Sequence, residues 1–218
     1  MSVRMGIFGG AFNPPHYGHL RTALEVKELW QLDHLLWIPS GGHPFKPTWQ
    51  LAATAHRLQM TQLAITTEPS FAICPIEAEK PGIAYTVDTL TELTRRFPLA
   101  DLVFILGADL FEELHKWKQW QELDRLAALC VLTRPGCEAF LHTTPAAEFY
   151  SPVTVEGALQ RPPEQGRKGC FLQPVTGFAI RSRDIRALVA QERSIRFLTP
   201  DPVIQYIHQH KLYLKRDE

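Results

Sequence analysis

The sequence is short of the features that would place the protein outside the ordinary globular class. Only four of its 218 residues are cysteines, and Cys74, Cys130, Cys137 and Cys170 form no C-x-x-C pair. This spacing excludes a dense disulfide framework and predicts free thiols in a reducing compartment. No apolar run reaches membrane-spanning length, and the N-terminal stretch meets a glycine pair too early for a signal-peptide core. We therefore expect a cytoplasmic protein with no membrane partner.

Charge of one sign is not in excess either. Lysine and arginine together number 23, aspartate and glutamate also number 23, and the formal net charge is zero. A nucleic-acid-binding protein usually carries a basic excess, so we expect no nucleic-acid partner. A small anionic substrate, which needs only a local positive site, fits this composition better, and a homo-oligomer is compatible with it.

Short apolar runs rich in β-formers alternate with segments of helical periodicity. The pattern predicts strands at 3–8, 34–38, 71–74, 102–106 and 129–133, helices at 20–30, 54–65, 86–97, 183–191 and 202–210, and helical pieces over 110–126. Such alternation favours an α/β fold with a doubly wound parallel sheet, Rossmann-like in arrangement. We expect a single domain over residues 1–218, with an irregular surface segment at 135–169 that holds at most a short helix, and a C-terminal helical part at 180–212.

In a doubly wound sheet, ligands gather outside the carboxyl ends of the strands. The loops after Phe8, Ile38, Leu106 and Thr133 are therefore the places where a site is expected. The first of these loops carries most of the functional information, because glycines, prolines and two histidines join the first predicted strand to the first predicted helix.

This first loop has the composition of a phosphate cradle. Gly9 and Gly10 allow a sharp turn and a close approach of the backbone to a ligand, and the two prolines that follow stiffen the loop. The next helix N-terminus offers backbone N–H groups and partial positive charge to an anion. His16 and His19 are three residues apart and face the same side of that helix, with Gly18 leaving room for a nucleotide.

Two imidazoles beside a polyphosphate can donate hydrogen bonds to oxygens whose charge shifts during group transfer. Two other interpretations of His16 and His19 remain open. The histidines could cap or pack a loop-to-helix junction, or they could bind a metal, although no third ligand with a recognisable spacing accompanies them. Their combination with the glycines, the prolines and the preceding strand favours phosphate.

The run from Gly9 to His19 closely resembles the G-G-x-F-x-P-x-H-x-G-H signature of the nucleotidyltransferase superfamily. Further segments resemble the bacterial nicotinate mononucleotide adenylyltransferases in particular, over nearly the whole chain. These are Pro44-Phe45-Lys46, Arg57 with Met60, Ala84-Tyr85-Thr86 with Thr89-Leu90, Gly107-Ala108-Asp109 with Trp117, Arg134-Pro135-Gly136, and Ile185-Arg186.

The resemblance implies a division of the site into two halves. His16 and His19 would be catalytic, and the acceptor would be held by Tyr85, Thr86 and Trp117. The backbone at Tyr85-Thr86 would hold the pyridine carboxylate at a helix N-terminus, where Thr86 is expected as the N-cap and Asp88 suits the dipole. ATP and its phosphates would be bound by Gly9, Gly10, Phe12, Gly18, Lys46, Gly107, Asp109, Arg134, Ser182, Arg183 and Arg186.

Several of these residues also have ordinary structural interpretations. Lys46 could be a solvated loop lysine, and Asp109 could simply cap the helix that follows its strand. Trp120 competes with Trp117 for the stacking position, and only the spacing from Gly107 favours Trp117.

The C-terminal motif departs from the family pattern I-S-S/A-T-x-I-R. This chain has Ile180-Arg181-Ser182-Arg183-Asp184-Ile185-Arg186, so arginines stand at two positions where hydroxyl residues are usual. Arg183 could replace a neutral phosphate contact with a charge-assisted one, or the change could weaken ATP binding.

The reaction that the resemblance implies is transfer of AMP from ATP to nicotinate mononucleotide, with Mg²⁺ screening the phosphates. Alternatives are the same chemistry on nicotinamide mononucleotide or phosphopantetheine, and a domain that senses ATP without turnover. A fragment related to class I aminoacyl-tRNA synthetases, suggested by the His-Tyr-Gly-His run, is disfavoured by the short chain, the neutral charge and the absence of a K-M-S-K-S-like run.

Overall fold

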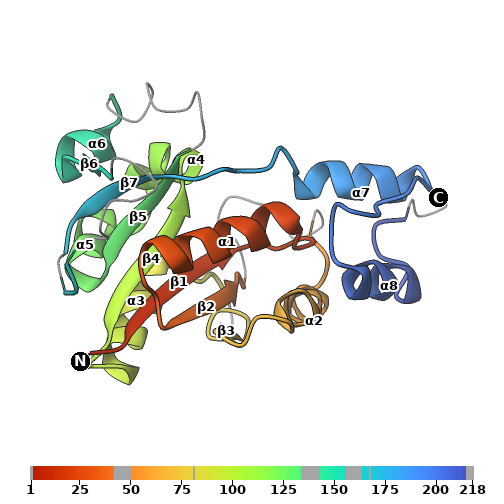
Figure 1. Cartoon of the computed structure of the whole chain (residues 1–218), viewed down its shortest axis with the longest axis horizontal. Helices are drawn as coiled ribbons and strands as arrows, with labels where there is room; N and C mark the ends of the chain where they lie inside the picture. Colours follow the sequence, from red (N-terminus) through yellow and green to blue (C-terminus); the bar gives the residue numbers. More distant parts are fainter. Residues whose placement is uncertain are drawn as a thin grey trace.

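A computed structural model of the chain shows a parallel sheet with helices against both of its faces (Figure 1). The structure describes residues 2–41, 51–80, 82–133, 143–155, 164–166 and 168–214. The predicted α/β class with a parallel, Rossmann-like sheet is confirmed.

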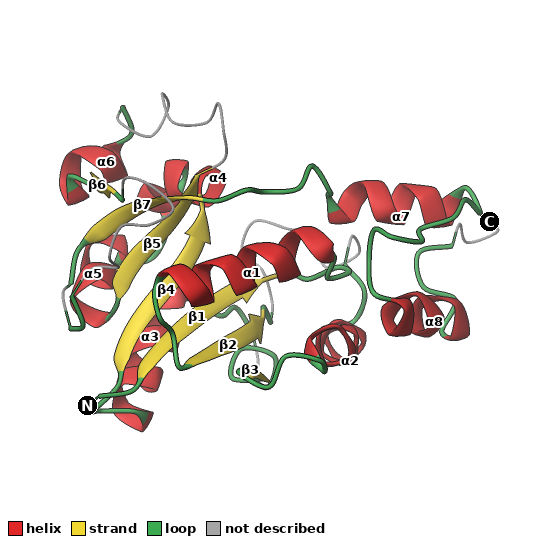
Figure 2. Ribbon diagram, viewed as in Figure 1, coloured by secondary structure: helices red, strands yellow, loops and turns green. Residues whose placement is uncertain are grey.

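The sheet has seven strands in the order β3-β2-β1-β4-β5-β7-β6, and all neighbouring strands run parallel (Figure 2). The strands are β1 Arg4–Gly10, β2 His34–Pro39, β3 Phe71–Ile73, β4 Asp101–Gly107, β5 Ala128–Thr133, β6 Val153–Thr154 and β7 Cys170–Pro174. Because β1 and β4 lie at the centre and are covered on both faces, their sequences are almost continuously apolar.

The helices are α1 Tyr17–Leu29, α2 Thr54–Ile65, α3 Thr86–Arg96, α4 Ala108–Glu112, α5 Leu123–Leu126, α6 Pro145–Tyr150, α7 Ser182–Ala190 and α8 Asp201–Gln209. Two short 3₁₀ turns, η2 Leu114–Lys116 and η3 Trp120–Glu122, lie between α4 and α5. One apolar core lies between the sheet and α1, α2, α7 and α8, and a second core lies under α3, α4, α5 and α6.

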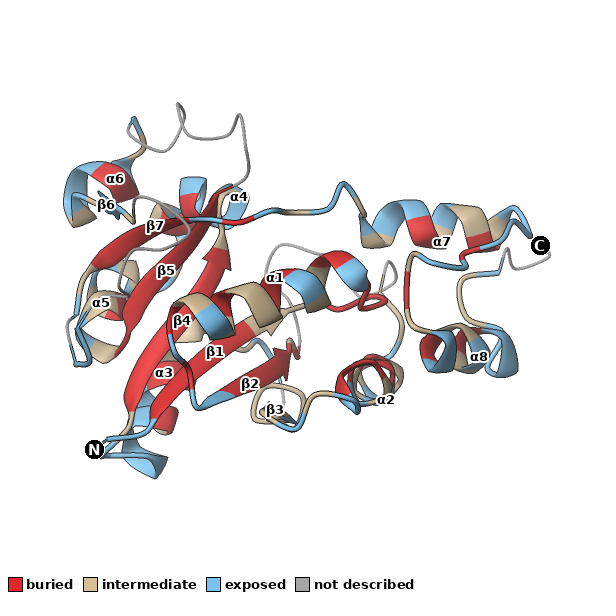
Figure 3. Cartoon of the chain, in the orientation of Figure 1, coloured by how far each residue is buried: buried red, intermediate tan, exposed pale blue. Residues whose placement is uncertain are grey.

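Successive residues of each strand alternate between the two cores. Phe104 of β4 belongs to the core under α3, whereas Ile105, the next residue, belongs to the core under α1. Strands β1, β2, β4, β5 and β7 are accordingly buried along most of their length, whereas the edge strands β3 and β6 are not (Figure 3). Burial on both faces fixes the register, since a shift by one residue would exchange the side chains of the two cores.

The predicted elements can be compared with those of the structure. Strands β6 and β7 were missed, because they are short and are preceded by segments without periodicity. The helical pieces expected over 110–126 are confirmed as four short pieces, and the backbone of Gln119 between them takes a left-handed conformation with φ of 47° that no continuous helix can contain. The one feature that was not predicted is therefore the pair of strands β6 and β7. The expected irregular segment at 135–169 contains the short helix α6 and strand β6 among its described residues.

The crossover connections change face between β1 and β4. Helices α1 and α2, which follow β1 and β2, cover one face, and α3 and α4, on either side of β4, cover the other. The carboxyl ends of β1 and β4 therefore form the switch point of the sheet, where ligands of such folds bind. Helices α7 and α8 lie beyond this edge, connected to β7 by an extended segment (Figure 1). Among the described residues, no helix has the length and apolar character needed to cross a membrane.

Candidate active site

The two histidines of the first loop form the start of helix α1. His16 is the N-cap residue, and its Nδ1 accepts a 3.3 Å hydrogen bond from the backbone N–H of His19. The N–H of His16 donates in return to Nδ1 of His19 at 3.2 Å. This reciprocal pair is a capping box, a role that a hydroxyl residue and a glutamate usually fill. The interpretation in which these histidines cap the helix is therefore correct for their Nδ1 atoms.

The cap also fixes where each imidazole carries its proton. Nδ1 of His16 and Nδ1 of His19 both accept from the backbone, so the proton of each neutral ring is on Nε2. The rings are stacked, with centroids 3.6 Å apart and planes 25° from parallel. The cap thus presents two Nε2–H donors from one helix turn.

Aromatic packing supports the histidine pair from below. Phe12 is 2% exposed, and its ring lies edge-on to the His19 ring with centroids 5.2 Å apart. Phe8 and Trp37 pack against Phe12 in turn, with ring centroids 5.6 Å and 5.0 Å from that of Phe12. Phe12 was expected to bind ATP or its phosphates, but its buried ring acts as the support on which His19 rests.

The glycines of the loop differ in their roles from those expected. Gly9 and Gly10 lie within β1, and the sharp turn is made by Phe12, whose φ is 44°. A Cβ on Gly10 would come within 3.0 Å of the Phe12 ring, and one on Gly18 would come within 3.0 Å of His16 Nδ1. Gly18 therefore makes room for the His16 ring. Among the described residues, a Cβ on Gly9 would meet no atom within 4 Å, so they leave space beside the backbone there.

Side chains from distant segments bind the carbonyl oxygens of the loop. Arg186 of α7 donates to the oxygen of Asn13 at 2.8 Å, and the Ser182 hydroxyl donates to that of Pro14 at 2.8 Å. Thr199, shortly before α8, donates to the oxygen of Pro15 at 2.7 Å. The loop after β1 is therefore fastened to the C-terminal helices.

Arg57 holds the same loop from the other side. Its side chain is almost fully buried in α2 and donates to the carbonyl oxygens of Ala11 at 3.0 Å and Ser40 at 2.7 Å. Burial lowers the pKa of its guanidinium from the usual value. Asn13 Oδ1 accepts from the backbone of Ala52 and from the hydroxyl of Tyr213. With its carbonyl groups bound in this way, the loop is rigid before any ligand arrives.

The start of α7 lies against the start of α1. A Cβ on Gly18 would be 3.7 Å from the carbonyl oxygen of Ile180, and Ser182 is the first residue of α7. Ser182 and Arg186 were expected to bind phosphate, yet both are bound to the loop. The single hydroxyl proton of Ser182 is used by Pro14, whereas Arg186 has further N–H groups available to an anion. The side chain of Arg183 is 66% exposed, and its Nε lies 3.5 Å from Oδ1 of Asp184.

The carboxyl end of β4 contributes a second backbone turn. Asp109 is an exposed residue in the first turn of the short helix α4. Its carboxylate lies so close to Gly107 that a Cβ on that glycine would be 2.5 Å from Asp109 Oδ1. A side chain at 107 would therefore displace the Asp109 carboxylate. The N-cap residue of α4 is Gly107 and not Asp109, so an N-cap role does not explain Asp109.

The residues expected to bind the acceptor gather at the N-terminus of α3. Tyr85 is the N-cap residue and Thr86 is the first helical residue, so the expected N-cap at Thr86 is wrong by one position. Within the described structure no side chain accepts a hydrogen bond as a cap here, and Asp88 lies in the first turn. Thr86 therefore lies in the first turn of the helix and is not its cap residue.

Trp117 and Trp120 differ in their surroundings. Trp120 is part of an aromatic cluster with Phe149 and Tyr150 of α6, at centroid distances of 5.0 Å and 5.6 Å, and the Tyr150 hydroxyl donates to its carbonyl oxygen. Trp117 is half-buried, with its ring 6.5 Å from that of Phe104. Packing accounts for Trp120, which leaves Trp117 as the better candidate for stacking on a ligand.

Sequence reasoning missed some residues of this region and named others that cannot be placed. Lys46 and Arg134 lie outside the described residues. Lys118, which the sequence did not single out, binds Asp88 and lies over the ring of Tyr85. Its position directly after Trp117 was the one signal that could have drawn attention to it. Among the described residues, no group of three or more His, Cys, Asp or Glu side chains is arranged to hold a metal ion.

The fold and this site are those of a nucleotidyltransferase. Residues 7–198 match the cytidylyltransferase-like family, and the chain belongs to that family. A protein of Thermomicrobium roseum named "Probable nicotinate-nucleotide adenylyltransferase" is 40% identical over 214 residues, which cover 96% of this chain and 91% of that protein. A protein of the same name from Citrifermentans bemidjiense is 37% identical over 218 residues, 97% of this chain and 99% of the relative.

Solved structures agree on the fold. The nicotinic acid mononucleotide adenylyltransferase of Plasmodium falciparum, complexed with NaAD, superposes with a TM-score of 0.71 over 97% of each chain, at 19% identity. The same enzyme complexed with APC gives a TM-score of 0.71 at 18% identity. The resemblance to nicotinate mononucleotide adenylyltransferases found in the sequence is thereby confirmed.

Proposed function

We propose that the protein transfers the AMP unit of ATP to the phosphate of nicotinate mononucleotide, giving nicotinate adenine dinucleotide and pyrophosphate, a step of NAD biosynthesis. The observation that carries this proposal is the histidine cap of α1, which places two stacked imidazoles on one helix turn at the switch point of the sheet. The names of relatives that share 35–40% of their residues with nearly the whole chain support the choice of substrates.

The reaction is a direct in-line substitution. An oxygen of the mononucleotide phosphate attacks the α-phosphorus of ATP, and a new P–O bond forms as the bond from that phosphorus to the bridging oxygen breaks. The bonding electrons leave with pyrophosphate. Because the nucleophile is already an anion, no general base is needed, and positioning with charge stabilisation supplies the acceleration.

In this mechanism His16 and His19 bind the phosphate oxygens on which charge increases. A rigid donor that is already aimed at those oxygens spends no energy on reorganisation when charge develops. The hydrogen bonds from Arg57, Ser182, Thr199 and Arg186 to the loop supply that rigidity. The open space beside Gly9 and the N-termini of α1 and α7 are suited to the triphosphate.

Other residues are assigned to ATP as part of the proposal. We assign Asp109, beside Gly107, to the ribose or adenosine, and the remaining N–H groups of Arg186, together with Arg183, to the phosphates. Lys46 and Arg134 keep the phosphate-binding role implied by the family motif. Ser182 acts through the loop, because its hydroxyl proton is bound to Pro14.

We assign the acceptor to the N-terminus of α3. The backbone N–H groups of the Tyr85-Thr86 turn would hold the pyridine carboxylate, since a helix N-terminus favours an anion. Trp117 would stack on the pyridine ring. This half of the site lies on the opposite face of the sheet from α1, so the two substrates would meet at the carboxyl edge between β1 and β4.

Nucleotidyltransferases that use ATP generally need a divalent metal, and we propose Mg²⁺ in that role. Mg²⁺ keeps several waters and is commonly held through phosphate oxygens. The described part of the chain offers no cluster of metal-binding side chains, so the ion would arrive with ATP as part of the substrate. We place the reaction in the cytoplasm, with small molecules as its partners.

The test is pyrophosphate release by the purified protein with ATP and Mg²⁺, using nicotinate mononucleotide, nicotinamide mononucleotide and phosphopantetheine as separate acceptors. A strong preference for nicotinate mononucleotide is expected. Turnover of another acceptor instead would overturn the assigned substrate but keep the histidine chemistry. ATP binding measured by calorimetry, without turnover of any acceptor, would overturn the enzymatic proposal and favour an ATP-sensing domain.

A further inference from the structure

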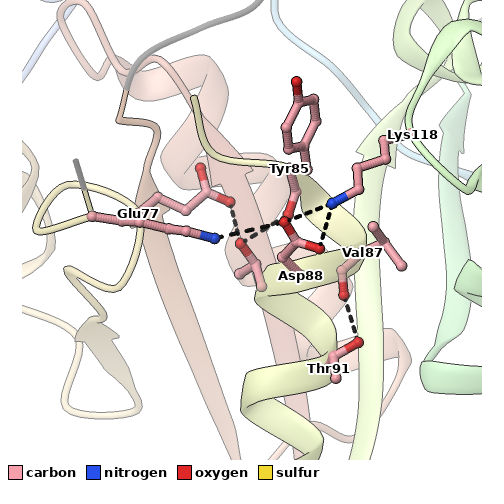
Figure 4. Close-up of polar contacts among 8 residues, drawn as sticks. Glu77, Tyr85, Val87, Asp88, Thr91 and Lys118 are labelled. Atoms are coloured by element: carbon pink, nitrogen blue, oxygen red, sulfur yellow. Dashed lines mark hydrogen bonds and ion pairs between the residues drawn. The ribbon is translucent and has the colours of Figure 1, made fainter. Parts of the chain in front are cut away.

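Lys118 connects the two elements to which the acceptor has been assigned. It directly follows Trp117 in the chain, and its side chain reaches the N-terminus of α3 (Figure 4). There the ammonium Nζ lies 4.9 Å from the centroid of the Tyr85 ring and 3.0 Å and 3.1 Å from the two carboxylate oxygens of Asp88. A cation on the face of an aromatic ring is attracted by the ring's electron density, so Tyr85 and Asp88 together fix the position of the ammonium.

Four charged side chains lie at this end of α3, and their formal charges balance. Asp88 is shared by two ammonium groups, because Lys80 Nζ also lies 3.6 Å from its Oδ2. Glu77 is the fourth group, since it accepts a hydrogen bond from the Thr89 hydroxyl and interacts with the charge of Lys80. The position of each charge therefore matters more than their sum. The helix dipole adds partial positive charge of the same sign as the ammonium groups, and no side chain in the described structure accepts a hydrogen bond there as an N-cap.

The position of the Lys118 ammonium matters for the choice between two pyridine substrates. Nicotinate and nicotinamide mononucleotides share the ring, ribose and phosphate, but the nicotinate group carries one additional negative charge. A nearby positive charge therefore favours the first over the second, whereas a stacking tryptophan treats the two rings nearly alike.

We infer that Lys118 is a specificity-determining residue, whose ammonium raises the preference of the enzyme for the carboxylate form of the pyridine nucleotide over the amide form. Asp88 opposes it by neutralising part of the charge, and the ring of Tyr85 holds the ammonium in place. This inference rests on the proposed function, because it concerns the acceptor half of the same site.

A purely structural ion pair predicts a different pattern of variants. If Lys118 and Asp88 only stabilised the fold, losing either partner would weaken activity with both acceptors alike. If they set the electrostatic potential of the site, Lys118→Met and Asp88→Asn change the substrate preference in opposite directions. This opposition of sign separates the two interpretations.

The experiment measures kcat/KM for nicotinate mononucleotide and for nicotinamide mononucleotide in the wild-type enzyme and its variants. Lys118→Met should lower the ratio of the two values by about three- to tenfold, mainly through a higher KM for nicotinate mononucleotide, since exposed charge pairs contribute modestly. Asp88→Asn should raise the ratio, and Lys118→Arg should preserve it. In the wild type the ratio should fall as salt is raised, because salt screens the charge.

Lys116→Met provides a matched control. Lys116 is two residues away, is similarly exposed, and is paired with Glu113 at 2.9 Å instead of with α3. The control should leave the ratio unchanged. An unchanged ratio in Lys118→Met, or a fall in both Lys118→Met and Asp88→Asn, would overturn the inference while wild-type preference for nicotinate mononucleotide keeps the proposed function. Absence of turnover with both pyridine acceptors would overturn both.

Discussion

Arg186 donates a 2.8 Å hydrogen bond from Nη1 to the backbone oxygen of Asn13, which joins residues 173 positions apart in the chain. This bond fastens helix α7 to the loop that precedes the catalytic histidines. An arginine assigned to ATP phosphates by its motif thus has a second task, which is to keep the loop in the shape that the histidines require. The two tasks can be separated by comparison with Arg183 on the same helix.

Arg186→Met should lower both stability and activity. Loss of a charge-assisted bond to a loop carbonyl is expected to cost roughly 1–2 kcal/mol of unfolding free energy, and loss of the loop geometry should lower kcat/KM for ATP by at least about tenfold. Thermal unfolding and initial rates measure these two effects.

Arg183→Met is the matched comparison, because the Arg183 side chain is 66% exposed. Its unfolding free energy should stay within about 0.5 kcal/mol of the wild type, while KM for ATP rises several-fold through loss of a phosphate contact. Equal stability in the two variants would contradict the fastening role assigned to Arg186.

His19 can be tested for its two roles separately, because Nδ1 serves the cap and Nε2 serves the reaction. Asparagine places an amide oxygen near the position of Nδ1 but has no atom at Nε2. His19→Asn should therefore keep the cap and lower kcat by about 10²–10³-fold. His19→Ala should lose a similar factor in kcat and, in addition, about 1 kcal/mol of stability with the cap.

His34→Asn supplies a control for this pair of variants, since His34 is exposed at the start of β2, at the opposite end of the sheet. Its turnover should match the wild type. Near-normal turnover in a folded His19→Asn variant would refute the assignment of Nε2 as the catalytic donor.

Much of the fold could be predicted because its signals are local. The helix at 54–65 was predicted with the bounds that the structure shows, and β1, β2, β4 and β5 were predicted to within two residues at each end. Buried parallel strands are continuous apolar runs, and the loop after β1 follows a dense motif. Strand β7 was missed because its five residues include a polar glutamine at the fourth position and give no clear period. The Gln173 side chain is buried and accepts a hydrogen bond from the indole of Trp30.

The site was predicted less completely because much of it depends on pairs of distant residues. Nothing in the local sequence indicates that Thr199 binds Pro15 or that Tyr213 binds Asn13, since these contacts exist only once α7 and α8 lie against the loop. Lys118 was missed for the same reason, because Asp88 is 30 positions away. The motif indicated His16 and His19, whereas the side chains that hold their loop in place became apparent only in the fold.

Gly18 and Gly9 make a second matched pair. A methyl group on Gly18 would be 3.0 Å from the His16 ring, while one on Gly9 would meet nothing within 4 Å. Gly18→Ala should shift the His16 ring and lower kcat by roughly tenfold, with little change in stability, because the helix gains about 1 kcal/mol from alanine and loses a similar amount to crowding.

Gly9→Ala should leave kcat nearly unchanged and raise KM for ATP, since the methyl group would occupy space assigned to the nucleotide. Rates at varied ATP concentration distinguish the two outcomes. A larger loss of kcat in Gly9→Ala than in Gly18→Ala would contradict the proposal that Gly18 leaves the space in which the His16 ring lies.

The pH dependence of stability should report the partly buried carboxyl of Glu77. Burial raises its pKa above the ordinary value of 4.5, while the hydrogen bond from the Thr89 hydroxyl and the charge of Lys80 oppose that rise. Over the interval between the unfolded and folded pKa values, the native state therefore holds a proton that the unfolded state has lost. Stability contributed by this group is complete below the unfolded pKa and is lost as the pH rises through the folded pKa.

Glu77→Gln removes this dependence, because glutamine is neutral at every pH and its oxygen can still accept from Thr89. The melting temperature of the variant should exceed that of the wild type at neutral pH, and the difference should vanish near pH 4, which thermal unfolding at a series of pH values would measure. Glu79→Gln, at an exposed position two residues away, should show no such pH-dependent gap. A Glu77→Gln variant that is less stable than the wild type by the same amount at every pH would mean that the carboxylate, despite its burial, contributes through its hydrogen bond to Thr89 alone.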